Sequence, residues 1–449
     1  MQTQVNESEV SPISVSFWTA FLYWLKLGFI SFGGPAGQIS MMHQELVERR
    51  RWISEHRFLH ALNFTMLLPG PEAQQLATYI GWLMHGVLGG IVAGTLFILP
   101  SLVILIALSW IYLAHHDVTA VAGILYGIKP AVTAIVVFAA YRIGSRVLKN
   151  VWLMSIAAAS FIAIAILHIP FPFIIFTAGV LGYIGSRIKP EKFAMATAHG
   201  AKKEIFGSAL IDDHTPIPEH AKFNRKRLFI YCLCGIILWL LPMLFLYIEY
   251  GWSGTLTQMG WFFTKAALLT FGGAYAVLPY VYQGGVEYYG WLTAGQMIDG
   301  LALGETTPGP LIIVVTFVGF LGGWKAQLFG PDLLAYAGIV AACLVTFFTF
   351  LPSFLFILIG GPAVEATRHE LGFTAPLTGI TAAVVGVVLN LAVVFAYHVL
   401  WPEGYTGQFI WPALVIGTVA FIALFYYRAG IVSVIGGSAA IGLVYSMLQ

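Results

Sequence analysis

A signature rich in glycine and proline occurs twice in this chain at one fixed distance. Its three landmarks, Phe32-Gly33-Gly34, Trp52 and Pro69-Gly70-Pro71, recur 239 residues later as Phe271-Gly272-Gly273, Trp291 and Pro308-Gly309-Pro310. Two more pairs share an offset of 252 residues: Leu99-Pro100-Ser101 with Leu351-Pro352-Ser353, and Gly127-Ile128 with Gly379-Ile380. Constant offsets that carry the glycine and proline positions indicate a duplicated unit with a short insertion. The chain is therefore expected to fold as two related repeats.

The composition places both repeats in a membrane. Hydrophobic residues make up 59% of the chain, charged residues only 9%, and the mean hydropathy is +0.85. Apolar runs of about 20 residues, the length that a helix needs to cross a bilayer, recur along most of the sequence. Alternating segments typical of a membrane β-barrel do not occur. The sequence predicts an all-α polytopic membrane protein.

Basic residues predict which loops are cytoplasmic. Eighteen of the 22 Lys and Arg residues lie in residues 1–227, and most fall in clusters at 49–57, 142–149 and 187–227, which the positive-inside rule places in the cytoplasm. Three apolar segments, 58–84, 86–113 and 120–141, separate the first two clusters, so one of them cannot cross. Pro69-Gly70-Pro71 divides 58–84 into two pieces too short to span. We expect this segment to be a re-entrant hairpin.

The second repeat is expected to have the opposite orientation. Residues 280–292, the counterpart of the Arg-rich loop, contain no Lys or Arg and are therefore expected outside. This predicts two inverted-topology repeats with re-entrant helical hairpins broken at Gly-Gly and Pro-Gly-Pro, a common construction in transporters. The predicted units are a first membrane repeat (1–187), a cytoplasmic linker (188–227) and a second membrane repeat (228–449) that begins with a connecting span (228–249). The amino terminus is predicted to be cytoplasmic and the carboxyl terminus periplasmic.

Two lysines at the same repeat position suggest an anionic ligand. Lys26 and Lys265 each precede the first glycine of their Gly-Gly pair by seven residues, in otherwise apolar sequence. A lysine near the bilayer centre costs roughly 2.5–3.5 kcal/mol on insertion scales, so it is expected to have a partner or a task. The alternatives are that each lysine reaches the membrane interface, or pairs with a carboxylate such as Glu72, Asp299 or Glu305.

The helix breaks offer a second source of positive potential. A helix that starts just after Pro71 or Pro310 has unpaired backbone N–H groups and the positive end of its dipole at its first turn. Such ends bind oxyanions, and glycine allows the backbone to approach the ligand closely. The alternative is that these residues only kink helices or pack small surfaces together.

The candidate substrate-binding residues lie at the breaks and beside them. They are Lys26, Gly33, Gly34, Pro35, Asn63, Pro69, Gly70, Pro71, Glu72, Gln74 and Gln75 in the first repeat, and Lys265, Gly272, Gly273, Glu305, Thr306, Thr307, Pro308, Gly309 and Pro310 in the second. Hydroxyls and amides suit a tetrahedral oxyanion. Glu72 and Glu305 would repel one, so they are expected either to pair with the lysines or to take a proton during transport.

Motifs for other functions are missing from the sequence. No zinc-protease, nucleophile-elbow or Walker A pattern occurs, so we expect no catalytic residue, metal or cofactor. The leading hypothesis is a secondary transporter for a small anion that works by alternating access. The alternative is an ion-coupled carrier or channel for another small solute that uses Glu72 and Glu305. An intramembrane enzyme would need a nucleophile or a metal set that the sequence lacks.

The motifs together resemble the chromate ion transporter family, in its long two-domain form, over almost the whole chain. The resemblance rests on Phe32-Gly33-Gly34-Pro35, on Leu67-Leu68-Pro69-Gly70-Pro71 followed by Ala77-Thr78-Tyr79-Ile80-Gly81, and on their repeated counterparts. It implies a multi-pass protein of the bacterial inner membrane that exports chromate, with sulfate as a related or competing oxyanion. Lipid is then a partner and nucleic acid is not; a homodimer stays open. The second repeat has Ala274 in place of Pro35 and Leu311 in place of Glu72, so equal roles for the halves are not expected.

Overall fold

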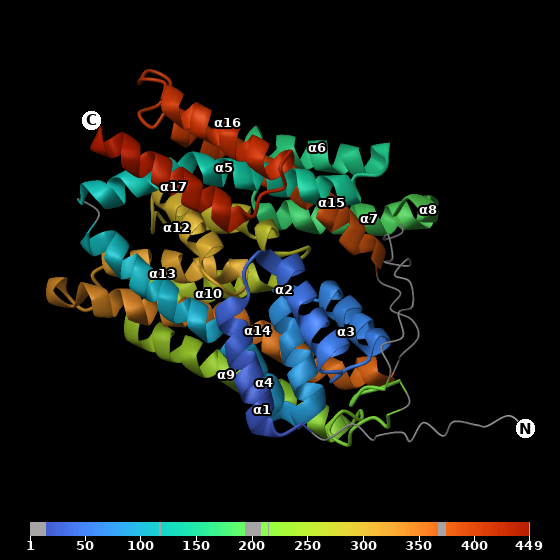
Figure 1. The fold of residues 1–449 in the computed structure, drawn as a ribbon. Coiled ribbons are helices and arrows are strands. Elements are labelled where there is room, and N and C mark those ends of the chain that lie inside the picture. Colours follow the sequence, from blue (N-terminus) through green and yellow to red (C-terminus); the bar gives the residue numbers. More distant parts are fainter. Residues whose placement is uncertain (1–14, 116–117, 194–207, 214, 367–373, 449) are drawn as a thin grey trace, which may run out of the picture.

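The described part of the chain is helical throughout. The computed structural model (Figure 1) describes residues 15–115, 118–193, 208–213, 215–366 and 374–448. Helices and short 3-10 and π turns make up its secondary structure, and within these ranges no β-strand forms. The first half contains α1 (Phe17–Ile30), α2 (Gly34–His43), α3 (Glu55–Leu67), α4 (Glu72–Ala114), α5 (Thr119–Val147), α6 (Val151–Ala165), α7 (Phe171–Ile188) and α8 (Pro190–Phe193). The predicted all-α polytopic class is confirmed.

The second half repeats this order after a connecting helix. It contains α9 (Arg225–Tyr250), α10 (Thr255–Leu268), α11 (Leu278–Tyr282), α12 (Ala294–Thr306), α13 (Val314–Lys325), α14 (Leu334–Ala366), α15 (Thr374–Leu400), α16 (Trp411–Phe425) and α17 (Ile431–Met447). Fine local features also recur at 239 residues. A six-residue π turn follows the Gly-Gly break in both halves, at Gln44–Arg49 and Gln283–Tyr288. The N-caps of α3 and α12, Ser54 and Thr293, each accept a backbone N–H three residues ahead.

Among the described residues, six helices are long and apolar enough to cross a membrane. They are α4, α5, α7, α9, α14 with its preceding turn, and α15. The helices α6, α16 and α17 are shorter, at 15 to 17 residues. At 1.5 Å per residue they extend about 22–26 Å, slightly less than the hydrocarbon core of a bilayer, so their flanking residues must complete any crossing.

The first half places one helix where the second half has two. In α4, His85 and Gly86 depart from helical geometry, and Gly86 has a φ of +67°. The part before this break corresponds to α13 and the part after it to α14. The linker covers the break, because His220 Nε2 donates a hydrogen bond to the Trp82 carbonyl over 2.8 Å. From the break to Ala114, α4 runs about 40 Å at 1.5 Å per residue, which is long enough to connect opposite membrane faces.

The two halves are interlocked rather than side by side. α5 packs on α17 where Gly127 meets Gly442, and α15 packs on α7 where Gly379 meets Gly182. Small residues of this kind allow helix backbones to approach closely in membranes. Figure 1 shows α5, α6, α7, α15, α16 and α17 together on one side, and α1, α3, α4, α9 and α14 on the other. The Pro-Gly-Pro segments lie where α4 and α14 cross between the repeats.

Candidate functional site

The two repeats exchange hydrogen bonds at their breaks. Gly70 N donates to Thr270 O over 2.8 Å, and Gly309 N donates to Ser31 O over the same distance. Gly70 and Gly309 are equivalent positions 239 residues apart, and so are Ser31 and Thr270. Each Pro-Gly-Pro tip therefore binds the backbone of the other repeat's Gly-Gly break. We call this pair of contacts the crossed breaks.

The backbone at the crossed breaks takes shapes that favour glycine. Gly33, Gly34, Gly272 and Gly273 have φ values between +72° and +100°. At the tips, Gly70 and Gly309 have φ values of +123° and +105°. A side chain at either tip would also collide with a serine of the other repeat, Ser353 for Gly70 and Ser101 for Gly309. Both the conformation and the close approach require glycine at the tips.

Long helices place the crossed breaks midway through the molecule. Ser101 Oγ donates to Pro308 O over 2.5 Å, which fixes the second tip against α4. Ser101 lies 15 residues after the break at Gly86 and 13 residues before Ala114, so it is about 20 Å from either end of that helix segment. The crossed breaks therefore lie near the centre of a span, at the depth where transporters with broken helices bind their substrates.

Buried polar side chains surround the crossed breaks. Gln38 Nε2 donates to Ser31 O over 3.1 Å and to Gly309 O over 2.5 Å, and Gln75 Nε2 donates to Pro69 O over 2.7 Å. Among the described residues, several fully buried atoms here have no hydrogen-bond partner: Ser31 Oγ, Ser353 Oγ, Gln38 Oε1, Gln74 Oε1 and Gln75 Oε1. Since buried polar groups are normally paired, this concentration favours a ligand site.

The predicted carboxylates are placed differently from each other. Glu305 is buried and accepts a hydrogen bond from the Tyr275 hydroxyl, while Arg142 of α5 acts on it electrostatically. Glu72 is the first residue of α4 and is half-buried. Neither carboxylate forms an ion pair within the described residues. Glu305 is therefore an internal acidic group beside the second tip, and Glu72 lies at the first.

The two lysines lie about one helical turn before the ends of α1 and α10, which lead into the breaks. Lys26 is exposed on α1, and Lys265 is half-buried on α10 with its Nζ 5.6 Å from the centre of the Trp261 ring. In the part of the chain that the structure describes, neither ammonium pairs with a carboxylate, and Asp299 pairs with Lys129 instead. The lysines are thus positively charged groups near the breaks, and no carboxylate of the described residues neutralises their ammonium groups.

Other predicted residues do not add free donors to the crossed breaks. Asn63 is exposed on α3. The hydroxyls of Thr306 and Thr307 donate to backbone carbonyls of their own helix, chiefly that of Leu303. Pro35 lies in the first turn of α2, where its missing N–H costs nothing. The predicted helix start after Pro71 is present, because α4 begins at Glu72, whereas a 3-10 turn, Leu311–Ile313, separates Pro310 from α13.

Five residues of the crossed breaks were missing from the sequence prediction: Ser31, Gln38, Ser101, Thr270 and Ser353. Ser101 and Ser353 belong to the repeated Leu-Pro-Ser match, which was used only as evidence of duplication. That match was the available signal, since a polar residue retained in both copies of an apolar segment needs a reason. Gln38 has no counterpart in the second repeat, where Val277 occupies its position, so repetition gave no signal for it.

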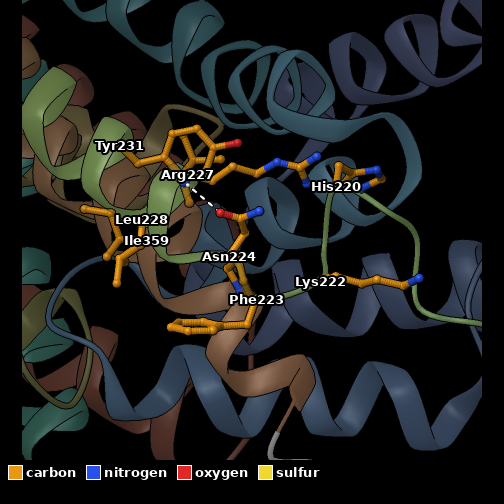
Figure 2. Close-up of a pocket in the computed structure, with 10 residues that line it drawn as sticks. His220, Lys222, Phe223, Asn224, Arg227, Leu228, Tyr231 and Ile359 are labelled. Carbon is orange, nitrogen blue, oxygen red and sulfur yellow. Dashed lines mark hydrogen bonds between the residues drawn. The ribbon is translucent and has the colours of Figure 1, made fainter.

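Two cavities lie away from this buried centre. The first, at the linker face (Figure 2), is lined by residues that include His220, Asn224, Arg227 and Tyr231. Its volume of about 10 Å³ is about one water position, too small for a tetrahedral oxyanion. The second, about 400 Å³, is an apolar groove between α7 and α15 that reaches Phe271. The first cavity is therefore excluded by its volume, and the second lacks the polar groups that an oxyanion needs.

Metal-binding chemistry is not supported within the described residues. No group of three or more His, Cys, Asp or Glu side chains comes together there in a way that could hold a metal ion. The fold and its buried centre define a polytopic, all-α membrane protein.

Comparison with known proteins identifies the family. A family model described as chromate transporter matches residues 18–183 and 257–443, which lie in both halves. The chain belongs to the chromate transporter family, which consists of membrane transporters and not of enzymes. No solved structure matches the chain.

Three relatives match almost the entire chain. The chromate transport protein of Pseudomonas aeruginosa is 34% identical over 423 residues, which cover 93% of this chain and 88% of that protein. The chromate transport protein of Cupriavidus metallidurans is 28% identical, with 95% of this chain and 93% of that protein covered. The probable chromate transport protein of Synechococcus elongatus is 28% identical, with 89% and 88% covered.

Proposed function

We propose that this protein exports chromate across the bacterial inner membrane as a secondary transporter, by alternating access around the crossed breaks. Its relatives are named as chromate transport proteins, and its own family is one of membrane transporters. The observation that carries the proposal is the exchange of hydrogen bonds between Gly70 and Thr270 and between Gly309 and Ser31. Because each tip is bound by the other repeat, any rocking of the repeats changes access to the residues between them.

The site offers a dianion donors and positive potential. The hydroxyls of Ser31 and Ser353 are buried donors without a partner among the described residues. The first turn of α4 adds backbone N–H groups that no side chain caps. Lys26 and Lys265 lie near the ends of the helices that lead into the Gly-Gly breaks. Their ammonium groups would add positive charge near the ligand when the breaks open. Sulfate has the same charge and tetrahedral shape, so it is expected to compete.

The orientation in the membrane follows from the basic loops. Residues 49–57 and the linker carry most of the positive charge and lie at the same end of the molecule, where Leu210 N donates to Arg51 O. We propose that this end is cytoplasmic, as the positive-inside rule requires. The carboxyl-terminal end of α17 then lies on the periplasmic side, since Figure 1 places it at the end opposite α8 and the linker.

Purified protein in proteoliposomes tests this function. Radiolabelled chromate should enter in a saturable way under an imposed potential or pH gradient, and unlabelled sulfate should reduce the entry. Lys26→Ala and Lys265→Ala should abolish chromate flux while membrane insertion, measured by size-exclusion chromatography of the extracted protein, stays intact. Normal export by both variants would show that the lysines are structural.

A second candidate function is favoured by the buried contact between Glu305 and Tyr275. An isolated carboxyl inside a membrane bundle is typical of proton or cation coupling. In this alternative the protein is an ion-coupled carrier or channel for another small solute. Glu72 and Glu305, and not the lysines, are then the residues on which transport depends. Acid-dependent flux that is lost in Glu72→Gln and Glu305→Gln but retained in the lysine variants would support it over the chromate proposal.

A further inference from the structure

A buried ion pair joins the first hairpin to the second repeat. Arg57, in the first turn of α3, places its Nη1 2.9 Å from Glu365 Oε2 near the end of α14. The Tyr79 hydroxyl of α4 donates to the other oxygen of the same carboxylate. Arg57 is 5% exposed and Glu365 2% exposed, so the pair is almost fully removed from solvent. We call these three residues the linker-face cluster, because α3 begins where Ser54 N donates to Ile211 O of the linker.

A second ion pair, in which only the carboxylate is buried, joins the other hairpin to the first repeat. Lys129 Nζ of α5 lies 3.3 Å from Asp299 Oδ2 of α12. The Tyr112 hydroxyl, two residues from the end of α4, donates to the same oxygen over 2.9 Å. Asp299 is 2% exposed and Lys129 35% exposed. We call these residues the far-face cluster.

The two clusters share one design at opposite ends of the molecule. In each, a carboxylate contacts a cation and a tyrosine hydroxyl, and the contact joins a hairpin helix of one repeat to a long helix of the other. Tyr112 lies 26 residues beyond the break at Gly86, which the linker covers, and so about 39 Å along α4 from the linker face. The charges are reversed between the clusters, because α3 supplies the cation and α12 supplies the anion.

The polar side chains at the crossed breaks are buried between the clusters. Ser31, Gln38, Gln75 and Ser101 have no measurable exposure, and Ser353 is 1% exposed. Arg57 lies about 15 Å along α3 from the first tip, and Asp299 about 10 Å along α12 from the second. Each cluster therefore lies at the base of one hairpin, with the buried side chains of the crossed breaks between the two clusters.

We propose that these clusters are the two gates of the transport cycle: the Arg57–Glu365 pair closes the linker face, and the Lys129–Asp299 pair closes the far face. The proposal rests on the alternating access described above. Opening one pair frees one hairpin from the opposite repeat and exposes the crossed breaks to one face only. The residues act by positioning the hairpins, because none of them touches the crossed breaks.

Accessibility of the crossed breaks from each face tests the gates. Ser31→Cys in a full-length chain with Cys232→Ala, Cys234→Ala and Cys343→Ala places one thiol at the crossed breaks. A charged, membrane-impermeant thiol reagent is added to inside-out and to right-side-out vesicles, and the labelling rate is measured. A separate Lys222→Cys chain identifies the linker face, because Lys222 is 55% exposed in the linker.

The two gate variants should act in opposite directions. Glu365→Gln should raise labelling of Ser31→Cys at least tenfold from the linker face alone, and Asp299→Asn should raise it similarly from the far face alone. Glu219→Gln removes an exposed ion pair with Lys222 and should change neither rate. Equal increases from both faces, or no increase, would show that the buried pairs only stabilise the fold and would overturn the proposal.

Milder variants keep the test decisive if the carboxylate variants fail to insert. Tyr79→Phe and Tyr112→Phe remove one hydrogen bond from each carboxylate and keep the ion pair. They should increase labelling from the linker face and from the far face respectively, by a smaller factor. Chromate flux of the parent chain is measured separately. Flux without sided labelling overturns the gates alone, whereas sided labelling without flux supports the gates and overturns chromate transport.

Discussion

The two Pro-Gly-Pro tips share their backbone but differ in the side chains around them. Gln74 and Gln75 follow the first tip along the chain, and their equivalents in the second half are Ile313 and Val314. Gln38 also belongs to the first half, but its amide donates to Ser31 O and to Gly309 O of the second tip, and its equivalent is Val277. The second half contributes Glu305 with Tyr275, whose equivalents in the first half are Met66 and Ala36. The two halves therefore share the backbone contacts of the crossed breaks, whereas the amides belong to the first half and the acid to the second.

This difference separates what the fold needs from what the ligand needs. The glycines and the Leu-Pro-Ser serines occur in both repeats because each tip must fit against the other repeat. The amides occur in one repeat only, so the backbone contacts of the crossed breaks do not require an amide in each repeat. We expect equivalent substitutions of the shared residues to reduce transport equally, whichever half carries them. A substitution of an unshared residue should reduce transport, whereas a substitution at the equivalent position of the other half should not.

The largest effect is expected from Gly309→Ala and Gly70→Ala. The positive φ alone costs about 1–2 kcal/mol for a residue with a Cβ, and the collisions with Ser101 and Ser353 add to it. Chromate flux in proteoliposomes should fall by at least about tenfold in both variants, since each 1.4 kcal/mol is a factor of ten. A large loss of flux in one variant with normal flux in the other would contradict the idea that the two tips have equivalent roles.

Gly436→Ala is the matched control for these substitutions. Gly436 lies in α17 with a conventional φ and no atom near the place of an added Cβ. The change should leave flux unaltered and raise stability by roughly 0.5–1 kcal/mol, because alanine favours a helix over glycine. A similar loss of flux in this variant would mean that the tip variants report general damage.

A moderate effect is expected from Gln38→Leu. The change removes the hydrogen bonds that the amide donates to Ser31 O and Gly309 O. At about 0.5–1.5 kcal/mol for each bond, chromate affinity should weaken by roughly tenfold. Val277→Leu at the equivalent position of the second repeat should have little effect. Equal losses from both variants, measured by equilibrium binding of radiolabelled chromate, would contradict the assignment of the amides to one half.

The smallest effect is expected at the π turn of the first repeat. Glu45 pairs with Arg50 over 2.7 Å, and this hydrogen bond is the main cause that lowers the pKa of the Glu45 carboxyl. Its second-repeat equivalent is Gly284, so the pair belongs to the first repeat alone. A lowered folded-state pKa contributes stability above the unfolded pKa of about 4.3, and that stability is lost as pH falls through the folded pKa.

Thermal unfolding of Glu45→Gln measures this contribution. At pH 7 the variant should be less stable than the parent by about 0.2–1 kcal/mol, as for a partly exposed ion pair. The difference should shrink as the pH is lowered below 4. A difference that stays constant down to pH 3 would show that packing, and not the charge, is responsible.

The sequence predicted the breaks better than it predicted their contacts. A constant offset identified the paired glycines, and the start of α4 at Glu72 follows from Pro71. An offset shows which positions are equivalent and says nothing of which positions touch. The contact of Gly70 with Thr270, and of Gly309 with Ser31, depends on how the two repeats pack, which the tertiary structure alone fixes.

The ion-pair partners of charged residues were likewise not predicted from the sequence. Arg57 was assigned to a basic loop because it follows three consecutive arginines, yet its side chain is buried against Glu365. Asp299 was considered as a partner for Lys26 or Lys265, but its partner is Lys129, which lies within a predicted apolar span. Pattern analysis located the charges along the chain, and only packing between repeats determined their pairing.

The central claim is that the crossed breaks bind the oxyanion. Equilibrium binding of radiolabelled chromate to the purified Ser31→Ala, Ser353→Ala double variant tests it most directly, since the two hydroxyls are buried donors from opposite repeats. The double variant should remain folded and lose saturable binding that sulfate displaces in the parent. Unchanged chromate affinity in the folded double variant would contradict the claim.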